Sequence, residues 1–421
     1  MGRLRTRRYL ATGVALVATL AAAVAPLGAM GAADAARSVR GFDGTTIKVA
    51  GIGIASQFGQ VPIGAKARIK RFNDNNEIKG VKIDYTEFVD DKQDPATTLS
   101  ETRRLVTQSG VFAIVGDVSQ NNPGDYLKQQ HVPYFGFAFD NSYCSPKPDK
   151  TIYGFGYNGC LVPSNPSVMP DAGKNPYTYV SQKTGKKNPT LAIFSNDSES
   201  GKNSVKFQQI AYKGAGFNVV ATNTQMPLPP VSDYTPYAQA MLTADNGKPP
   251  DAILCLLATD CISMWNLIKA NGYQGSYFSS LYADVLVKAM AGSVSSTLYT
   301  PVDQTTPGME QLKKDVDAIQ PGSSSKIDTG MMAGYLSTDM FITALKTAAK
   351  KGKNGITPEN VQKAAMNQTW QLKGVAGPTV YPQSTVSSYQ SCSAEVLSDG
   401  TAWKQVLPYT CSKKQYKVKG A

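Results

Sequence analysis

Side chains that commonly do chemistry are few in this chain, and their spacing matches no catalytic motif. His131 is the single histidine among 421 residues, which argues against a Ser-His-Asp triad or a histidine-based metal site. The sequence contains neither G-x-S-x-G nor the phosphate-binding pattern G-x-x-x-x-G-K-[ST]. Residues 323–326 match S-x-x-K and residues 183–185 match K-T-G, but in the wrong order along the chain. We therefore expect no enzyme, no cofactor and no metal, and a secreted hydrolase is the least supported alternative.

Three clustered carboxylates, Asp90, Asp91 and Asp94, are the remaining candidates for metal or acid–base chemistry. No glycine-containing EF-hand loop surrounds them. Asp94 precedes Pro95, and this pair is typical of a helix start, with a capping residue followed by proline at the first helical position. We expect a structural turn between a strand and a helix.

Net charge points to a basic surface. Lys and Arg number 43 against 31 Asp and Glu, which gives +12. Residues 1–35 hold four arginines and one aspartate, so a chain beginning at residue 36 carries a net charge of about +9. Because the basic residues are scattered and form no dense stripe, we expect no nucleic-acid binding.

The N-terminus has the pattern of an export signal. Basic residues 3–8 precede an apolar stretch at 9–27, and Ala33-Asp34-Ala35 fits a cleavage site. We expect residues 1–35 to be removed, with a membrane anchor as the alternative. Arg7-Arg8 is a weak twin-arginine feature, so the export route stays open. No cysteine lies near the cleavage site, so we expect a secreted or periplasmic protein without a lipid anchor.

Six cysteines in an exported chain favour disulfides over free buried thiols. They form three local couples, so we expect the pairs Cys144–Cys160, Cys255–Cys261 and Cys392–Cys411.

Strands and helices alternate twice along the chain. The hydrophobic pattern predicts strands at 47–54, 81–88, 111–115 and 133–137, with helices at 64–75, from 95, and at 125–130. Residues 140–189 are rich in Pro, Gly, Asn, Ser and Tyr and break this alternation. It resumes with strands at 190–194, 217–221, 252–257 and 277–279 and helices at 202–212, 234–243 and 262–270. Helices at 310–319, 331–349 and 358–366 follow, then short strands and turns at 378–411. The alternation predicts parallel sheets with helices on both faces.

This order of elements resembles the type I periplasmic binding proteins, specifically the branched-chain amino acid receptors of ABC transporters. The resemblance rests on residues 46–51, 64–66, 73–82, 89–95 and 111–116 in that order, and it covers about residues 45–410. It implies an α/β fold of two lobes, each a parallel sheet flanked by helices, with a hinge between them. The lobes would comprise 45–158 with 302–376 and 159–301 with 377–421, and the chain would cross near Cys160, Pro301 and Gly377.

In such a fold, ligands bind beyond the carboxyl ends of the strands. The predicted ligand-binding residues on the first lobe are Gln57, Phe58, Ser119, Gln120, Asn121, Asn122, Phe139, Asp140 and Asn141. Those on the second lobe are Ser198, Glu199, Ser200, Thr259, Asp260 and Tyr282. Residues 119–122 could bind a polar or anionic group at a helix start, and simple helix capping is an equal alternative.

The resemblance also implies how an amino acid would be held: hydroxyls and amides bind the carboxylate, and an aromatic hydroxyl with an acid binds the ammonium group. Here Asn121 and Asp140 replace the hydroxyls, and Ser200 replaces the tyrosine. Leu281 or Tyr282 stands where the acid is expected, and Phe58 keeps an aromatic position. These departures favour a small polar or aromatic solute. The expected partners are that solute and the membrane subunits of an ABC permease, with the protein a monomer. An extracellular sensor or adhesion module of the same fold is the alternative.

Overall fold

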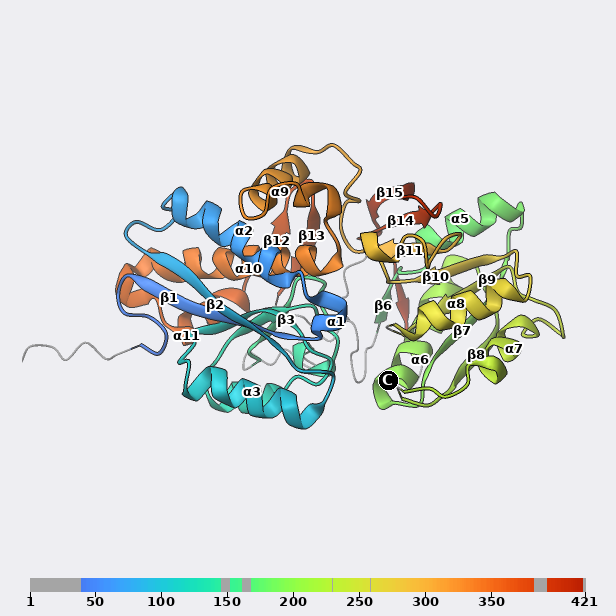
Figure 1. Ribbon diagram of the computed structural model, residues 1–421, viewed down its shortest axis with the longest axis horizontal. Helices are drawn as coiled ribbons and strands as arrows, with labels where there is room; N and C mark the ends of the chain where they lie inside the picture. The colour runs from blue at the N-terminus through green and yellow to red at the C-terminus, as the bar shows by residue number, and fades with distance from the viewer. Residues whose placement is uncertain are drawn as a thin grey trace, which may run out of the picture. The chain divides into compact units, whose positions relative to one another are not determined.

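The computed structural model describes residues 39–144, 152–160, 168–228, 230–257, 259–381 and 392–418 (Figure 1). The predicted signal peptide at 1–35 lies outside these residues. Among the described residues, no helix has the length and apolar character needed to cross a membrane.

The first sheet has five strands in the order β2-β1-β3-β4-β5, and all neighbouring strands are parallel. These strands are β1 (Thr46–Gly53), β2 (Lys82–Asp90), β3 (Ala113–Val118), β4 (Tyr134–Gly136) and β5 (Gly154–Gly156). The strands expected from the hydrophobic pattern are confirmed, and β5 adds one within the predicted break. β3 is buried at every position, as a central parallel strand covered on both faces should be.

Helices cover both faces of this sheet. Alternate residues of β1 separate onto the two faces, because successive side chains of a strand point in opposite directions. Ile47 and Val49 pack with α2 (Val61–Asp74), α9 (Pro307–Asp317), α10 (Thr329–Ala348) and α11 (Pro358–Ala365). Ala50 and Ile52 pack with α3 (Pro95–Thr107) and α4 (Gly124–Gln129). Half of the helical cover therefore comes from the C-terminal third of the chain.

The helices α2 and α10 approach each other at glycines. A Cβ at Gly64 would collide with the backbone carbonyl of Met331, and one at Gly334 with that of Val61. The helix expected at 331–349 is a core helix, and its residues Met331, Met332 and Met340 are buried. The absence of a side chain at the two glycines is what lets the two backbones touch.

Buried ion pairs join the same helices. Arg68 on α2 donates to Asp339 of α10 at 2.6 Å and to Glu77 at 2.8 Å. The indole Nε1 of Trp370 donates to the other Asp339 oxygen at 3.0 Å. Each buried charge in this group thus has a partner, which is the condition under which such charges are tolerated.

The second sheet has seven strands in the order β15-β14-β11-β10-β9-β7-β8. These are β7 (Thr190–Asn196), β8 (Asn218–Met226), β9 (Ala252–Cys255), β10 (Ser276–Ser279), β11 (Val294–Thr297), β14 (Cys392–Ser398) and β15 (Trp403–Cys411). The first five are parallel, whereas β14 and β15 are antiparallel. The fully parallel arrangement expected for this sheet therefore holds only for five strands, because a tight turn at 399–402 joins β14 to β15 as a hairpin.

Helices again cover both faces. α7 (Thr235–Leu242) and α8 (Asp260–Ala270) pack on one face of the second sheet. α5 (Lys174–Thr184) and α6 (Glu199–Ala215) pack on the other. The remaining elements are α1 (Ala55–Phe58), β6 (Val168–Pro170), β12 (Thr369–Leu372), β13 (Ala376–Val380), β16 (Gln415–Lys417) and the 3-10 turns η1 (Asn141–Tyr143), η2 (Asp284–Leu286), η3 (Ser323–Lys326), η4 (Ala349–Lys351) and η5 (Lys353–Gly355).

All three expected cysteine pairs are disulfide-bonded: Cys144–Cys160, Cys255–Cys261 and Cys392–Cys411.

Residues just beyond β12–β13 attach to the first sheet, where Tyr381 donates to the carbonyl of Gly156 at 3.1 Å. The exact boundaries of the two lobes stay a prediction.

Candidate ligand-binding site

The predicted site residues of the first sheet follow the carboxyl ends of its strands. Gln57 and Phe58 belong to α1 directly after β1, and Ser119 follows β3. Phe139 and Asp140 follow β4, and Asn141 begins η1 as an exposed residue. Gln120 is half-buried at the same bend as Ser119. Parallel strands bring these segments to one edge of the sheet.

Ser119 lies fully buried at the centre of a hydrogen-bond network. Its hydroxyl donates to Asp91 Oδ2 at 2.5 Å, and its amide donates to Asp117 Oδ1 at 3.0 Å. The amide of Asn121 donates back to the Ser119 hydroxyl oxygen at 3.1 Å. Asp91 is itself fully buried and accepts from the Gln93 amide at 3.0 Å. Asp91 is therefore a structural part of this edge, while Asp94 caps α3 by accepting from the Thr97 amide at 2.7 Å, as predicted.

Asn122 links the segment after β3 to the one after β4. Its amide donates to Asp140 Oδ2 at 2.9 Å, and its side-chain Nδ2 donates to Asp117 Oδ2. The other oxygen of Asp140 accepts from the Ser142 amide at 2.8 Å. The helix-start amides that sequence reasoning offered to a ligand thus donate to the protein's own oxygens.

Burial, with a smaller contribution from the nearby charge of Asp140, raises the pKa of Asp117 to about 8. Burial also raises the pKa of Asp140 above its ordinary value. Both shifts arise because the carboxylates are removed from water. Within the described part of the chain, no Lys or Arg forms an ion pair with Asp91, Asp117 or Asp140.

Aromatic rings lie beside this network. Phe58 and Phe139 meet edge to face with ring centroids 5.5 Å apart, and Phe137 lies 4.4 Å from Phe139. Phe137 also packs on Tyr157, at 5.7 Å. The side-chain oxygen of the half-buried Gln57 is inaccessible to solvent and has no hydrogen-bond partner in the structure.

On the second sheet, the predicted residues again follow strand ends, but they do not form one network. Ser198 caps α6 by accepting from the Gly201 amide at 2.9 Å. Glu199 and Ser200 are the first residues of α6, and their side chains lie outside the described ones. Thr259 is exposed immediately before α8, and Asp260 accepts from the Tyr234 hydroxyl at 2.6 Å.

Tyr282, from the segment after β10, reaches the start of α10. Its carbonyl accepts from the Thr329 hydroxyl at 2.6 Å and from the Thr329 amide at 3.1 Å. Asp328 caps α10 by accepting from the Met331 amide at 2.8 Å, and burial raises its pKa to about 6. A Cβ built on Gly330 would lie 3.2 Å from both Asp328 Oδ1 and Phe58 Cα, so the start of α10 also adjoins α1.

Sequence reasoning missed Asp328, Thr329 and Phe137 as neighbours of the site. An Asp followed by Thr before a long apolar helix is a recognisable cap, and this signal could have moved the expected helix start from 331 to 329. Its position beside α1 depends on a contact between segments far apart in sequence.

The described residues contain no group of three or more His, Cys, Asp or Glu arranged to hold a metal ion. A hollow of about 310 Å³ opens between α2 and α9, lined in part by Lys70, Arg71, Asp74 and Asp315. Its charges are paired with each other, Lys70 with Asp74 and Arg71 with Asp315.

Comparisons with known proteins agree with this architecture. A family model described as periplasmic binding protein matches residues 50–386. No curated protein matches the sequence. A fatty acid ABC transporter substrate-binding protein from Thermomonospora curvata shares 16% identity, covers 90% of this chain and 95% of its own, and has a TM-score of 0.67.

Two further structures are similar. A solute-binding protein of an ABC transporter from R. palustris, in complex with 4-hydroxybenzoate, shares 17% identity at a TM-score of 0.64, over 88% of this chain and 98% of its own. A branched-chain amino acid transporter substrate-binding protein from Streptococcus pneumoniae, in complex with isoleucine, shares 18% identity at a TM-score of 0.63, over 87% and 100%. Identities this low establish the fold and leave the ligand open.

The family consists of solute-binding proteins that act outside the cytoplasm. Its match over most of the chain agrees with the two-lobed α/β fold of the neighbours. The chain belongs to the family of periplasmic binding proteins, and its fold is that of the type I members.

Proposed function

We propose that this protein is the solute receptor of an ABC importer and binds a small polar or aromatic solute at the carboxyl edges of its two sheets. Ligand binding would close the two lobes about the crossings, and the permease would recognise the closed form. The binding surface would include Phe58, Phe139 and Asn122 on the first lobe, with Asp260 and Tyr282 on the second.

One contact supports this proposal most directly. The Tyr282 carbonyl, at the edge of the second sheet, accepts two hydrogen bonds from Thr329 at the start of α10. α10 is a core helix of the first sheet, and its Gly330 packs on the backbone of Phe58. The two predicted halves of the site therefore adjoin the same helix terminus.

The crossings support a hinge. Thr300 donates from its amide to the Val375 carbonyl at 2.8 Å. The Tyr409 hydroxyl lies 3.4 Å from the Leu298 carbonyl and accepts from the Gly377 amide at 3.2 Å. The segments near 300 and 376 are thus bonded side by side, so they would bend together in a rigid-body closure.

The test is a thermal-shift screen of the protein from residue 36 onward against amino acids, amides, sugars and aromatic acids. A ligand at 100 times its Kd adds about 2.7 kcal/mol to the free energy of unfolding. A saturable ligand should also reduce the radius of gyration measured by small-angle scattering. An unchanged radius at saturation would refute closure.

A matched pair of variants locates the site. Phe139→Ala should weaken the ligand found in the screen at least about tenfold, because the ring provides apolar contact area. Tyr126→Ala removes a partly buried ring that packs on the α3 and α4 side of the same sheet, and binding should not change. Equal losses in both variants would argue against this edge as the binding surface.

A further inference from the structure

The hydrogen-bond donors of Ser119 and Asn122 at the first-sheet edge are already committed. Ser119 donates from its hydroxyl to Asp91 and from its amide to Asp117. Asn122 donates from its amide to Asp140 and from its side chain to Asp117. A ligand carboxylate at this helix start would therefore find its usual donors bound to carboxylates of the protein.

Two amide oxygens at the same edge are spare acceptors, and the buried hydroxyls of Ser142 and Tyr143 lie beside the acids Asp140 and Asp117. The side-chain oxygens of Gln57 and Asn122 are both inaccessible to solvent and have no hydrogen-bond partner in the structure. The orientation of the Asn122 amide is set by its Nδ2 donating to Asp117. Buried acceptors without partners are costly, so these two oxygens favour a ligand that donates hydrogen bonds.

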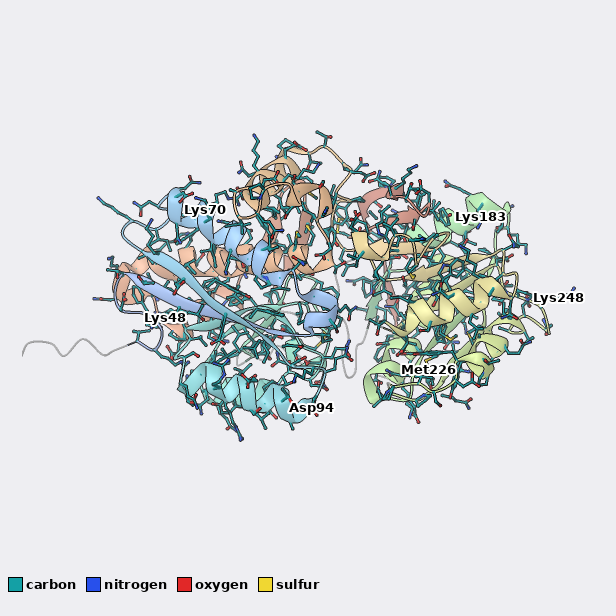
Figure 2. All side chains as sticks on the ribbon, in the orientation of Figure 1. Lys48, Lys70, Asp94, Lys183, Met226 and Lys248 are labelled. Carbon is teal, nitrogen blue, oxygen red and sulfur yellow. A yellow bond between two sulfur atoms is a disulfide. The ribbon has the colours of Figure 1, made fainter. Side chains whose placement is uncertain are left out.

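Charge is distributed unevenly along both sheets. The last two residues of the parallel strands and the segments that run from them to the next helix contain Asp90, Asp91, Asp94, Asp117, Asp140, Asp171, Asp197, Asp233 and Asp303. Lys92 is the single basic residue in the described part of these segments. Figure 2 marks the carboxyl end of each sheet. Asp94 lies at that end of the first sheet, away from Lys48, and Met226 lies at that end of the second sheet, away from Lys183 and Lys248.

Helix capping explains a part of this distribution, since acids are favourable at helix starts. It does not explain Asp117, which is fully buried within β3 and has no cation partner among the described residues; the raised pKa of Asp117 keeps this carboxyl largely protonated at pH 7, so the negative charge of the edge comes from the other aspartates. In a chain with 43 basic and 31 acidic residues, the carboxyl edges are therefore regions of negative potential.

We propose that the ligand is an organic cation, a protonated amine on an aromatic or apolar body, without a carboxylate. This inference rests on the proposed receptor function. The ammonium group would lie near the acidic segments and donate to the free oxygens of Gln57 and Asn122. The rings of Phe58 and Phe139 would contact its apolar body and the face of its cation.

Four compounds that share a phenol ring and a short chain separate charge from shape. They are tyramine (cation), 2-(4-hydroxyphenyl)ethanol (neutral), tyrosine (zwitterion) and 3-(4-hydroxyphenyl)propionate (anion), each titrated by calorimetry at pH 7. Tyramine should bind at least about tenfold more tightly than the propionate, with the alcohol between them, because opposite charges attract strongly in a partly buried site. Raising the salt concentration should weaken the binding of tyramine and leave the affinity for the alcohol unchanged.

A variant and its control test the source of this preference. Asp140→Asn keeps the shape of the side chain. It should weaken the binding of tyramine at least about fivefold and leave the affinity for the alcohol unchanged. Asp74→Asn removes an exposed acid at the C-terminal end of α2, away from the site, and should change neither. If Asp140→Asn does not fold cooperatively, Asp328→Asn replaces it with the same expectation.

Each result bears on the inference separately from the receptor function. Propionate binding as tightly as tyramine, or more tightly, would overturn the cation assignment and still support a solute receptor. Absence of binding by all four compounds would also overturn it, and the receptor function would then be judged by the broader screen. Preference for tyramine that survives high salt unchanged would contradict the electrostatic argument.

Discussion

The carboxyl group of Glu395 should make the stability of this protein fall as the pH rises. Glu395 is fully buried on β14 and accepts one hydrogen bond, from the Ser296 hydroxyl at 2.6 Å. Its other oxygen has no partner in the structure, and Tyr179 on α5 is the titratable group that faces it. Burial raises the pKa of Glu395 from 4.5 to about 8.

The sign of the effect follows from proton linkage. The native state keeps its proton up to about pH 8, whereas the unfolded chain loses it near pH 4.5. The stabilisation that the protonated group contributes is fully present below pH 4.5, and it is lost as the pH rises from 4.5 to about 8. At about 1.4 kcal/mol per pKa unit, the loss approaches about 5 kcal/mol as an upper bound.

Glu395→Gln removes this titration but adds an amide donor that needs a partner. At pH 4.5 the variant should be less stable than the wild type by about 1 kcal/mol, because a buried amide without a full set of hydrogen bonds is costly. Above pH 8 the variant should be the more stable protein by about 2–4 kcal/mol. The order of stabilities therefore reverses between these two pH values.

Urea unfolding at pH 4.5, 6, 7 and 8.5 measures this directly. Glu310→Gln is the control, since Glu310 on α9 is only partly buried beside Lys313 and should change stability by less than about 0.5 kcal/mol at every pH. A difference between wild type and Glu395→Gln that stays constant from pH 4.5 to 8.5 would refute the reasoning.

Three further variants test the packing by urea unfolding at pH 7. Gly334→Ala should lose about 1–3 kcal/mol, because its methyl group would collide with the Val61 carbonyl; an unchanged stability would show that α10 can shift. Thr306→Ala should lose about 1–2 kcal/mol by uncapping α9, and Thr306→Ser should restore most of it. Trp370→Phe should lose about 1–3 kcal/mol, because buried Asp339 loses a donor; a neutral result would mean that another group replaces it.

Much of the fold could be predicted because its strands are short apolar runs bounded by polar turns. β3 lies in such a run, and the alternation in β2 was equally readable. The elements missed within residues 140–189 include β5 and α5. β5 has only the residues Gly-Phe-Gly, and α5 buries a single large apolar side chain, Val180. Elements that bury so little apolar surface give no periodic signal.

The location of the candidate site followed from topology, but its hydrogen bonds did not. The rule that ligands bind beyond strand ends selected Ser119 and Asp140 correctly as edge residues. The 2.5 Å bond from Ser119 to Asp91 joins residues 28 positions apart, and local pattern cannot predict it. The approach of Gly330 to Phe58 depends in the same way on how α10 packs against α1.

The late position of α10 in the sequence has a consequence for the order of folding. The strands of the first sheet are complete by residue 156, yet three of the four helices that cover one of its faces begin at or after Pro307. The five parallel strands of the second sheet and their helices lie between Lys174 and Thr297. A chain that emerges from its N-terminus would therefore hold this apolar face covered by α2 alone until α9, α10 and α11 are free, after the parallel part of the second sheet is complete.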